Sequence, residues 1–235
     1  MNKIRLSLAA TLVAVFLTAS STMLFAADKQ ETSKAPAPEL SIDKSRTAVL
    51  IMDYQNDIVA MMPEKEQGPL LERAATVLKE ARRAGIPVIY IVVRFRDGYP
   101  EINPRNKLFS GLKESGRFRE GTPGAEVNAK VAPQPGDIVV TKRRVGAFST
   151  TDLETILRAK NIDTLVLFGV STSGVVLSTV RWAADMDYRM VVVADACADR
   201  SEEVHRVLTE KVFPWQAAVA TTQEVIKALG TKERP

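Results

Sequence analysis

Short continuous runs of apolar residues, separated by segments of helical periodicity, limit the possible folds of this chain more than any other feature. Residues 47–52, 88–93 and 164–170 contain almost no polar side chain. Such runs are typical of parallel strands that are buried on both faces. The pattern predicts a doubly wound α/β fold, in which helices cover both faces of a mostly parallel, six-stranded sheet.

The rest of the pattern completes this alternation. We expect three further strands, over residues 137–141, 190–194 and 217–221. Apolar spacing and capping residues predict helices over residues 70–84, 152–159, 174–186, 202–212 and 223–229. Residues 94–135 are polar and rich in Gly and Pro, and a loop of this length is usually functional or contains short elements.

The N-terminus resembles a secretory signal peptide. Lys3 and Arg5 precede a mostly apolar run over residues 6–17, and small residues follow at Ala26 and Ala27. We therefore expect a signal peptide over residues 1–27, a flexible linker over 28–44 and one domain over 45–235. The expected protein is exported, to a bacterial periplasm, and free of the membrane after cleavage; the alternative is an uncleaved anchor.

Charge and residue counts exclude several classes of protein. The formal net charge of +4 falls to about +2 once Lys3 and Arg5 are removed, because no acid precedes Asp28. This value argues against nucleic acid as a partner. The single cysteine, Cys197, cannot form an internal disulfide, and the single histidine, His205, argues against a Ser-His-Asp triad or a multi-histidine metal site. We expect no metal and no cofactor.

Polar side chains follow the ends of the predicted strands, where α/β sheets bind their ligands. Asp53, Arg94, Lys142, Ser171 and Thr172 all lie at such positions. Burial at a strand end favours the protonated form of Asp53, so its carboxyl group is able to shuttle a proton. Lys142 is placed to pair with Asp53 and to stabilise an oxyanion. The plainer alternatives are a turn aspartate and a surface lysine.

The segment over residues 168–179 reads as a buried strand, a turn of small residues and the start of a helix. Its backbone amides favour an anion or oxyanion site. Serine catalysis would need Asp53 or Lys142 as its base. Cys197 is expected to be a small buried residue with an inert thiol, because Asp195 and Asp199 would raise its pKa.

Four blocks resemble the isochorismatase-like hydrolase superfamily, from about residue 47 to residue 222. They are Ile51-Met52-Asp53-Tyr54-Gln55-Asn56-Asp57, Gly121-Thr122-Pro123-Gly124 with Glu126, Lys142-Arg143-Arg144-Val145-Gly146-Ala147-Phe148, and Gly169-Val170-Ser171-Thr172. The resemblance implies a hydrolase of small amides, ureides or enol ethers, with Asp53 and Lys142 as catalytic residues. It also implies a cis bond between Val170 and Ser171. The position of the family's catalytic cysteine is occupied here by Val175.

This departure leaves three hypotheses. The first is a hydrolase that works by Asp53/Lys142 acid-base catalysis, with Ser171 and Val175 at the oxyanion site. Its expected substrate-binding residues are Gln55, Arg94, Arg144, Phe148 and Thr172. The second is a non-catalytic periplasmic protein that binds a small molecule in the retained pocket. The third is a thiol hydrolase that uses Cys197. The resemblance further implies a homo-oligomer, a dimer or larger.

Overall fold

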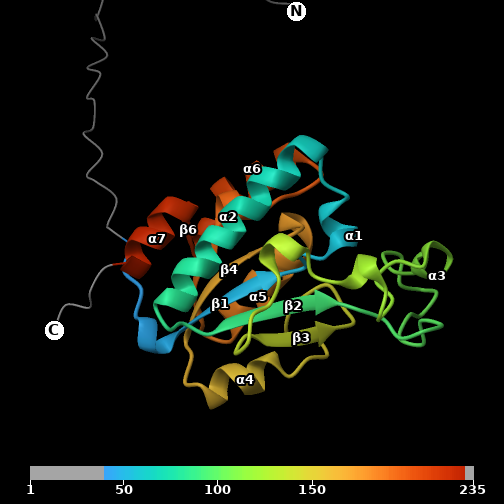
Figure 1. Ribbon diagram of the computed structural model, residues 1–235, viewed down its shortest axis with the longest axis horizontal. Helices are drawn as coiled ribbons and strands as arrows, with labels where there is room; N and C mark the ends of the chain where they lie inside the picture. Colours follow the sequence, from blue (N-terminus) through green and yellow to red (C-terminus); the bar gives the residue numbers. More distant parts are fainter. Residues whose placement is uncertain (1–39, 231–235) are drawn as a thin grey trace, which may run out of the picture. The chain divides into compact units, whose positions relative to one another are not determined.

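The computed structural model describes residues 40–230, so the predicted signal segment and residues 231–235 lie outside it. Six strands form one sheet in the order β3-β2-β1-β4-β5-β6, and every neighbouring pair is parallel (Figure 1). The strands are β1 (Thr47–Met52), β2 (Val88–Val93), β3 (Ile138–Lys142), β4 (Thr164–Gly169), β5 (Arg189–Val193) and β6 (Ala218–Ala220). The predicted doubly wound α/β fold is confirmed, and the sheet is parallel throughout.

Helices follow most of the strands. They are α1 (Asn56–Val59), α2 (Glu64–Arg83), α3 (Leu112–Ser115), α4 (Leu153–Ala159), α5 (Leu177–Asp185), α6 (Glu202–Val207) and α7 (Thr222–Gly230). Helices α2 and α7 pack together on one face (Figure 1). The chain moves in opposite directions along the sheet from β1 to β2 and from β4 to β5, so right-handed crossovers place α2 and α5 on opposite faces.

The core lies in the middle of the sheet. Every residue of β1, β2 and β4 is buried, which explains why these strands read as continuous apolar runs. Ile42 also packs into the core, ahead of the predicted domain start at residue 45. Within residues 40–230, no helix combines the length and apolar character needed to cross a membrane.

Several predicted boundaries are wrong, for local reasons. Helix α2 begins at Glu64 and includes Pro69, whereas the prediction began it after this proline. Glu64 and Glu66 lie in its first turn, where acidic side chains favour a helix. The predicted helix over residues 174–186 is interrupted, because a π-helical turn over Thr172–Val176 precedes α5. A second π-helical turn, over Leu208–Val212, follows α6 in the same way.

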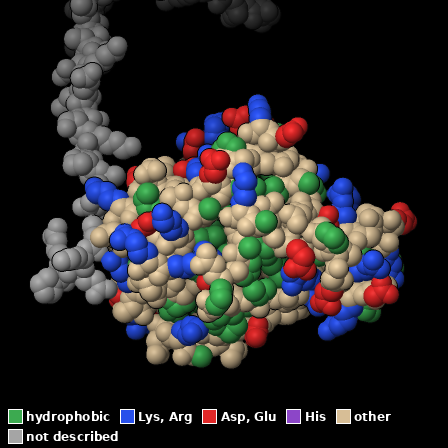
Figure 2. Space-filling model, viewed as in Figure 1, with side chains coloured by type: hydrophobic (Ala, Val, Ile, Leu, Met, Phe, Trp, Pro, Cys, Tyr) green, Lys and Arg blue, Asp and Glu red, His purple; other side chains and the backbone are tan. Residues whose placement is uncertain are grey.

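The strand order places the site. The order reverses between β1 and β4, and ligands of open α/β sheets bind beyond the carboxyl ends of the strands at this switch point. Residues 94–137, which connect β2 to β3, contain α3 and two short 3-10 helices, Pro123–Ala125 and Ala129–Val131. On the face drawn in Figure 2, basic and acidic side chains are interspersed around a central group of hydrophobic ones.

Candidate active site

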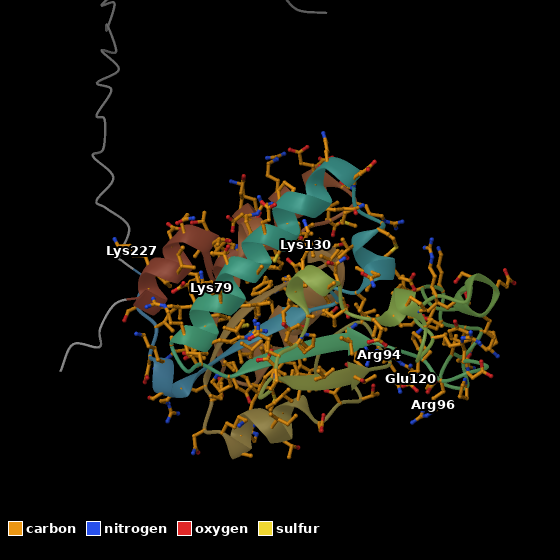
Figure 3. All side chains as sticks on the ribbon, in the orientation of Figure 1. Lys79, Arg94, Arg96, Glu120, Lys130 and Lys227 are labelled. Atoms are coloured by element: carbon orange, nitrogen blue, oxygen red, sulfur yellow. The ribbon has the colours of Figure 1, made fainter. Side chains whose placement is uncertain are left out.

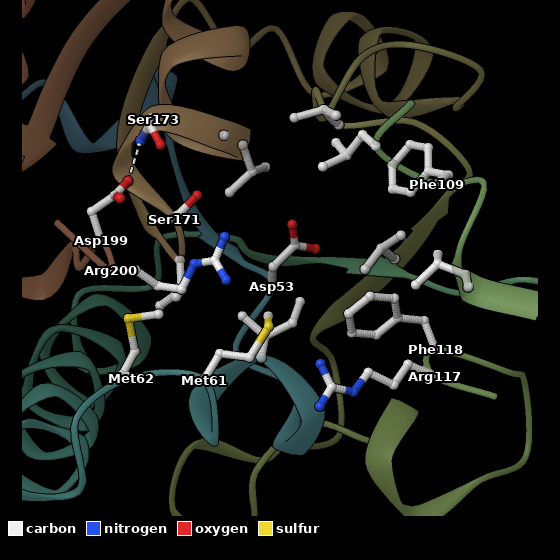
Figure 4. Close-up of a pocket in the computed structure, with 18 of the residues that line it drawn as sticks. Asp53, Met61, Met62, Phe109, Arg117, Phe118, Ser171, Ser173, Asp199 and Arg200 are labelled. Atoms are coloured by element: carbon white, nitrogen blue, oxygen red, sulfur yellow. Dashed lines mark hydrogen bonds between the residues drawn. The ribbon is translucent and has the colours of Figure 1, made fainter. Parts of the chain in front are cut away.

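A pocket of about 570 Å³ lies at the carboxyl ends of the central strands (Figure 4). Its floor contains Asp53 after β1, Val93 of β2, Lys142 of β3 and Val170 after β4. The long connection between β2 and β3 supplies another part of its wall, through residues such as Phe109 and Phe118. The topological switch point and the pocket therefore coincide.

Asp53 lies in the centre of this floor. Its backbone is left-handed, with φ of 59°, a conformation that aspartate tolerates better than most residues. Its amide donates to the carbonyl of Ile91 at 2.8 Å, which ties it to β2. One carboxylate oxygen, Oδ2, lies 2.9 Å from Lys142 Nζ, whereas the buried Oδ1 has no partner among the described residues. Oδ1 is thus the oxygen left to meet a ligand.

Lys142 is the last residue of β3 and is almost fully buried, with 2% of its surface exposed. Its ammonium group donates to the carbonyl of Arg144 at 3.0 Å as well as pairing with Asp53. Burial raises the pKa of Asp53 above its ordinary value of 3.8, and the charge of Lys142 acts in the opposite direction. A carboxyl group with a raised pKa and one free oxygen is able to accept and return a proton.

The turn after β4 forms the second half of the floor. The peptide bond between Val170 and Ser171 is cis, as the resemblance predicted. Val170, Ser171 and Val175 all line the pocket beside Asp53 and Lys142. The turn is held by Thr172, whose amide donates to Ala198 at 2.8 Å. The structure therefore brings together the two predicted catalytic residues and the three residues of the predicted oxyanion site.

No thiol reaches this floor within the described residues. Val175 is buried against Gly169 and presents only an aliphatic side chain. Cys197 is buried outside the pocket lining, and burial raises its pKa to about 12. Burial also lowers the pKa of His205, whose Nδ1 lies 2.8 Å from Thr172 Oγ1. Neither residue is placed to supply a thiolate or a base to the pocket.

The five predicted substrate-binding residues lie outside the lining. Gln55 is fully buried, donates to the carbonyls of Val93 and Ala125, and accepts from the amide of Val93. The other four are also engaged elsewhere. Arg94 pairs with Glu126, Arg144 donates to the carbonyl of Arg143, Phe148 stacks on Trp182, and Thr172 contacts His205. Their side chains are thus used by the fold.

The sequence analysis missed several residues that line the pocket. Met61 and Met62 follow α1, Phe109, Arg117 and Phe118 belong to the β2–β3 connection, and Arg200 follows β5 by a short segment (Figure 4). Arg200 directly follows Asp199, which accepts a hydrogen bond from the amide of Ser173 at 2.7 Å. The position of Arg200 after a predicted strand was the one sequence feature that could have identified it as a pocket residue. Arg117 had none, because its segment has no regular pattern.

Ion pairs anchor the β2–β3 connection to the end of the sheet. Arg143 pairs with both Glu101 and Glu120, and Arg96 pairs with Glu101 from the other side. Arg94, Arg96 and Glu120 lie near one another beyond the end of β2 (Figure 3). Asp57 accepts a hydrogen bond from the amide of Phe118 at 3.1 Å. These contacts hold the pocket wall over the floor.

The described residues contain no cluster of three or more His, Cys, Asp or Glu side chains arranged for a metal ion. The site that the structure assembles is instead a buried carboxyl-ammonium pair, a turn of small residues and an apolar wall. This arrangement provides a proton donor or acceptor and a region of low polarity in which it acts.

Comparisons with known proteins show which sequences and folds this chain resembles. A sequence profile described as Isochorismatase domain matches residues 47–224. A probable isochorismatase from Pseudomonas chlororaphis is 34% identical over 79% of this chain and 87% of its own length. The ureidoacrylate amidohydrolase RutB of Methylobacterium radiotolerans is 31% identical, with 85% of each chain covered. The crystal structure of a cysteine hydrolase from Pseudomonas syringae pv. phaseolicola superimposes with a TM-score of 0.73 at 26% identity, over 81% of this chain and 95% of that one.

Proposed function

The chain belongs to the isochorismatase family of hydrolases, and we propose that it hydrolyses a small molecule by Asp53/Lys142 acid-base catalysis without a cysteine nucleophile. The free Oδ1 of Asp53 carries the proposal. It is buried, it has no partner within the described residues, and it belongs to a carboxyl group whose other oxygen is held by Lys142. Such a group is oriented for proton transfer before a substrate arrives.

For an amide or ureide, ionised Asp53 takes a proton from a water molecule as the water oxygen attacks the carbonyl carbon. The amides of Ser171 and Val175 are proposed to stabilise the oxyanion that forms, with the charge of Lys142 nearby. Asp53 then returns the proton to the leaving nitrogen, and the C–N bond breaks. The products are a carboxylic or carbamic acid and an amine, and Asp53 regains its starting state.

For an enol ether, the same carboxyl group acts first in its protonated form. Asp53 protonates the terminal carbon of the double bond, which leaves an oxocarbenium ion. Water adds to this cation and its proton goes to the Asp53 carboxylate; the hemiketal then collapses to a ketone and an alcohol. The raised pKa of Asp53 supports this route as well as the first.

One observation favours a second candidate function, a non-catalytic small-molecule-binding protein. Val175 presents no nucleophile to the pocket, although the pocket itself is well formed. Such a protein would show thermal stabilisation by ligands with no product.

In either function, we propose that residues 1–27 direct export and that the protein forms a homo-oligomer.

A panel of small amides, ureides and enol ethers tests the proposal, with product identified by mass spectrometry. We expect turnover of at least one class and a fall of about 10³-fold in kcat for Asp53→Asn, since one acid-base group contributes 10²–10⁴-fold. Cys197→Ala should retain full activity. Unchanged turnover in Asp53→Asn would contradict the mechanism, and ligand binding without turnover across the panel would favour the binding protein.

A further inference from the structure

Two arginines in the pocket wall define the substrate class, and this inference rests on the proposed function. We propose that Arg117 and Arg200 bind carboxylate groups of the substrate, which is therefore a small carboxylic acid and not a neutral amide. Arg117 comes from the β2–β3 connection, and Arg200 follows the segment after β5. They are specificity-determining residues, separate from the Asp53/Lys142 pair.

Both guanidinium groups point into the pocket. In Figure 4, Arg200 enters from the side of Ser171 and Asp199, and Arg117 enters from the side of Phe118. The carboxylate of Asp53 lies between these two sides of the pocket. A substrate held by both arginines would therefore lie across Asp53, with its reacting bond over the free Oδ1.

Neither guanidinium group has a partner among residues 40–230, whereas most arginines around this pocket do. The paired arginines in this region are Arg94 with Glu126, Arg96 with Glu101, Arg119 with Asp97, and Arg143 with Glu101 and Glu120. An arginine that lines a pocket without a carboxylate partner is available to a ligand. Its planar fork of donors matches a carboxylate in a bidentate manner.

Neither carboxylate in the lining pairs with Arg117 or Arg200. Asp53 pairs with Lys142, and Asp199 accepts from the amides of Ser173 and Ser201. The lining thus contains three cationic side chains against two carboxylates, and the uncompensated charge is positive. Uncompensated positive charge in a pocket favours binding of an anion over a neutral molecule of the same shape.

The remaining wall is mainly apolar. Met61, Leu108, Phe109 and Phe118 contribute to it. This surface fits the hydrocarbon part of a small acid, and the pocket of about 570 Å³ is large enough for one such molecule. The chemistry therefore indicates a compact mono- or dicarboxylate with a hydrolysable bond.

Isothermal titration of the full chain with succinate, and with the neutral analogue succinamide, tests this assignment without requiring turnover. We expect succinate to bind more tightly, with an affinity that falls as salt is added. Arg117→Gln and Arg200→Gln should each weaken succinate binding about 10-fold, because each variant loses a hydrogen bond between two charged groups. Succinamide binding should change little in both variants.

Arg105→Gln is the matched control, because Arg105 is an exposed arginine of the same connection that lies outside the pocket lining. It should leave succinate binding unchanged. Absence of succinate binding at millimolar concentration, equal affinity for succinamide, or an equal loss in Arg105→Gln would each overturn the assignment. Tight binding of inorganic phosphate with none of succinate would also contradict it. Succinate binding in a protein that turns over no substrate would refute only the proposed function.

Discussion

The floor and the rim of the pocket differ in the exposure of their charged side chains and in their attachment to the sheet. The floor consists of Asp53, Lys142 and the turn over residues 170–175, and the rim consists of residues 108–118 with Arg200. Asp53 and Lys142 are 5% and 2% exposed, whereas Leu108 is 66% exposed. The floor is attached to the ends of β1, β3 and β4, and the rim belongs to the β2–β3 connection, which contains α3, and to the segment after β5. This difference suggests that the floor performs the chemistry and the rim selects the substrate.

The loss of a charged side chain also affects the free energy of unfolding differently in the two regions. A buried ion pair loses much of its hydration, and removal of one partner leaves an uncompensated charge. An exposed guanidinium group in the rim is still hydrated, so its loss affects folding little. Substitutions in the floor should therefore alter both chemistry and stability, and substitutions in the rim should alter binding alone.

After Asp53→Asn, the largest effect is expected from Lys142→Met. Loss of the ammonium group removes the charge that lowers the pKa of Asp53, so this pKa rises further. For a C–N substrate, which needs ionised Asp53, the rise of kcat/KM with pH should move to higher pH. We expect kcat to fall about 10²-fold at neutral pH, measured in a pH-rate profile beside wild type.

The same variant has a predicted stability profile. A raised pKa in the folded protein means that Asp53 retains a proton that the unfolded chain releases above pH 3.8. The free energy of unfolding of Lys142→Met should therefore decrease as pH rises from this value through the raised pKa. Urea denaturation at several pH values measures it. An unmoved pH-rate profile in a folded variant would separate Lys142 from the function of Asp53.

A smaller effect is expected where the floor and the rim are connected. Gln55 joins the end of β2 to Ala125 of the β2–β3 connection through three buried hydrogen bonds. Gln55→Leu keeps the side chain's approximate size but removes the hydrogen bonds that Gln55 makes with the buried amide and carbonyl of Val93, whereas the carbonyl of Ala125 still accepts from Arg94 Nε at 3.2 Å. We expect a loss of about 2 kcal/mol in the free energy of unfolding, measured by urea denaturation.

Gln67→Leu is the control for this substitution, because Gln67 is only half-buried and donates one hydrogen bond, to the carbonyl of Met62. Its expected loss is about 1 kcal/mol or less. Equal losses in the two variants would show that Gln55 does not connect the regions in the way the hydrogen bonds indicate.

The smallest effect concerns the position that lacks a nucleophile. A cysteine at Val175 would line the pocket with Lys142, whereas Cys197 lies outside the lining and has a pKa of about 12. Val175→Cys should react with iodoacetamide at least about 10-fold faster than wild type, because the thiolate is the reactive form. The rate of alkylation, followed by mass spectrometry, measures this. Equal alkylation rates in Val175→Cys and wild type would mean that iodoacetamide does not reach the side chain at position 175.

The floor was largely predictable from the sequence, because it depends on burial. Residues 47–52 and 88–93 were predicted as strands with the bounds that the structure has. A polar residue directly after such a run must lie at the end of the sheet, which is why Asp53 and Lys142 were found. Gln55 and Phe148 were predicted to bind substrate, and nothing in their residue type reveals that the fold engages their side chains.

The rim was not predictable, because its position depends on tertiary contacts. Residues 94–135 have no helical or alternating pattern, so α3 and the position of Arg117 had no local signal. The π-helical turn at Thr172–Val176 was missed for a related reason, since its residues read as an ordinary helix start. Long-range ion pairs, such as that between Arg143 and Glu120, determine where this segment lies.

The division between floor and rim is tested most directly by steady-state kinetics with the best substrate of the panel. Two variants are compared with wild type: Asp53→Asn and the double variant Arg117→Gln/Arg200→Gln. The account predicts that Asp53→Asn lowers kcat about 10³-fold with little change in KM. The double variant should raise KM about 10-fold or more and leave kcat within a few-fold of wild type. A fall in kcat confined to the double variant, or an unchanged kcat in Asp53→Asn, would contradict the account.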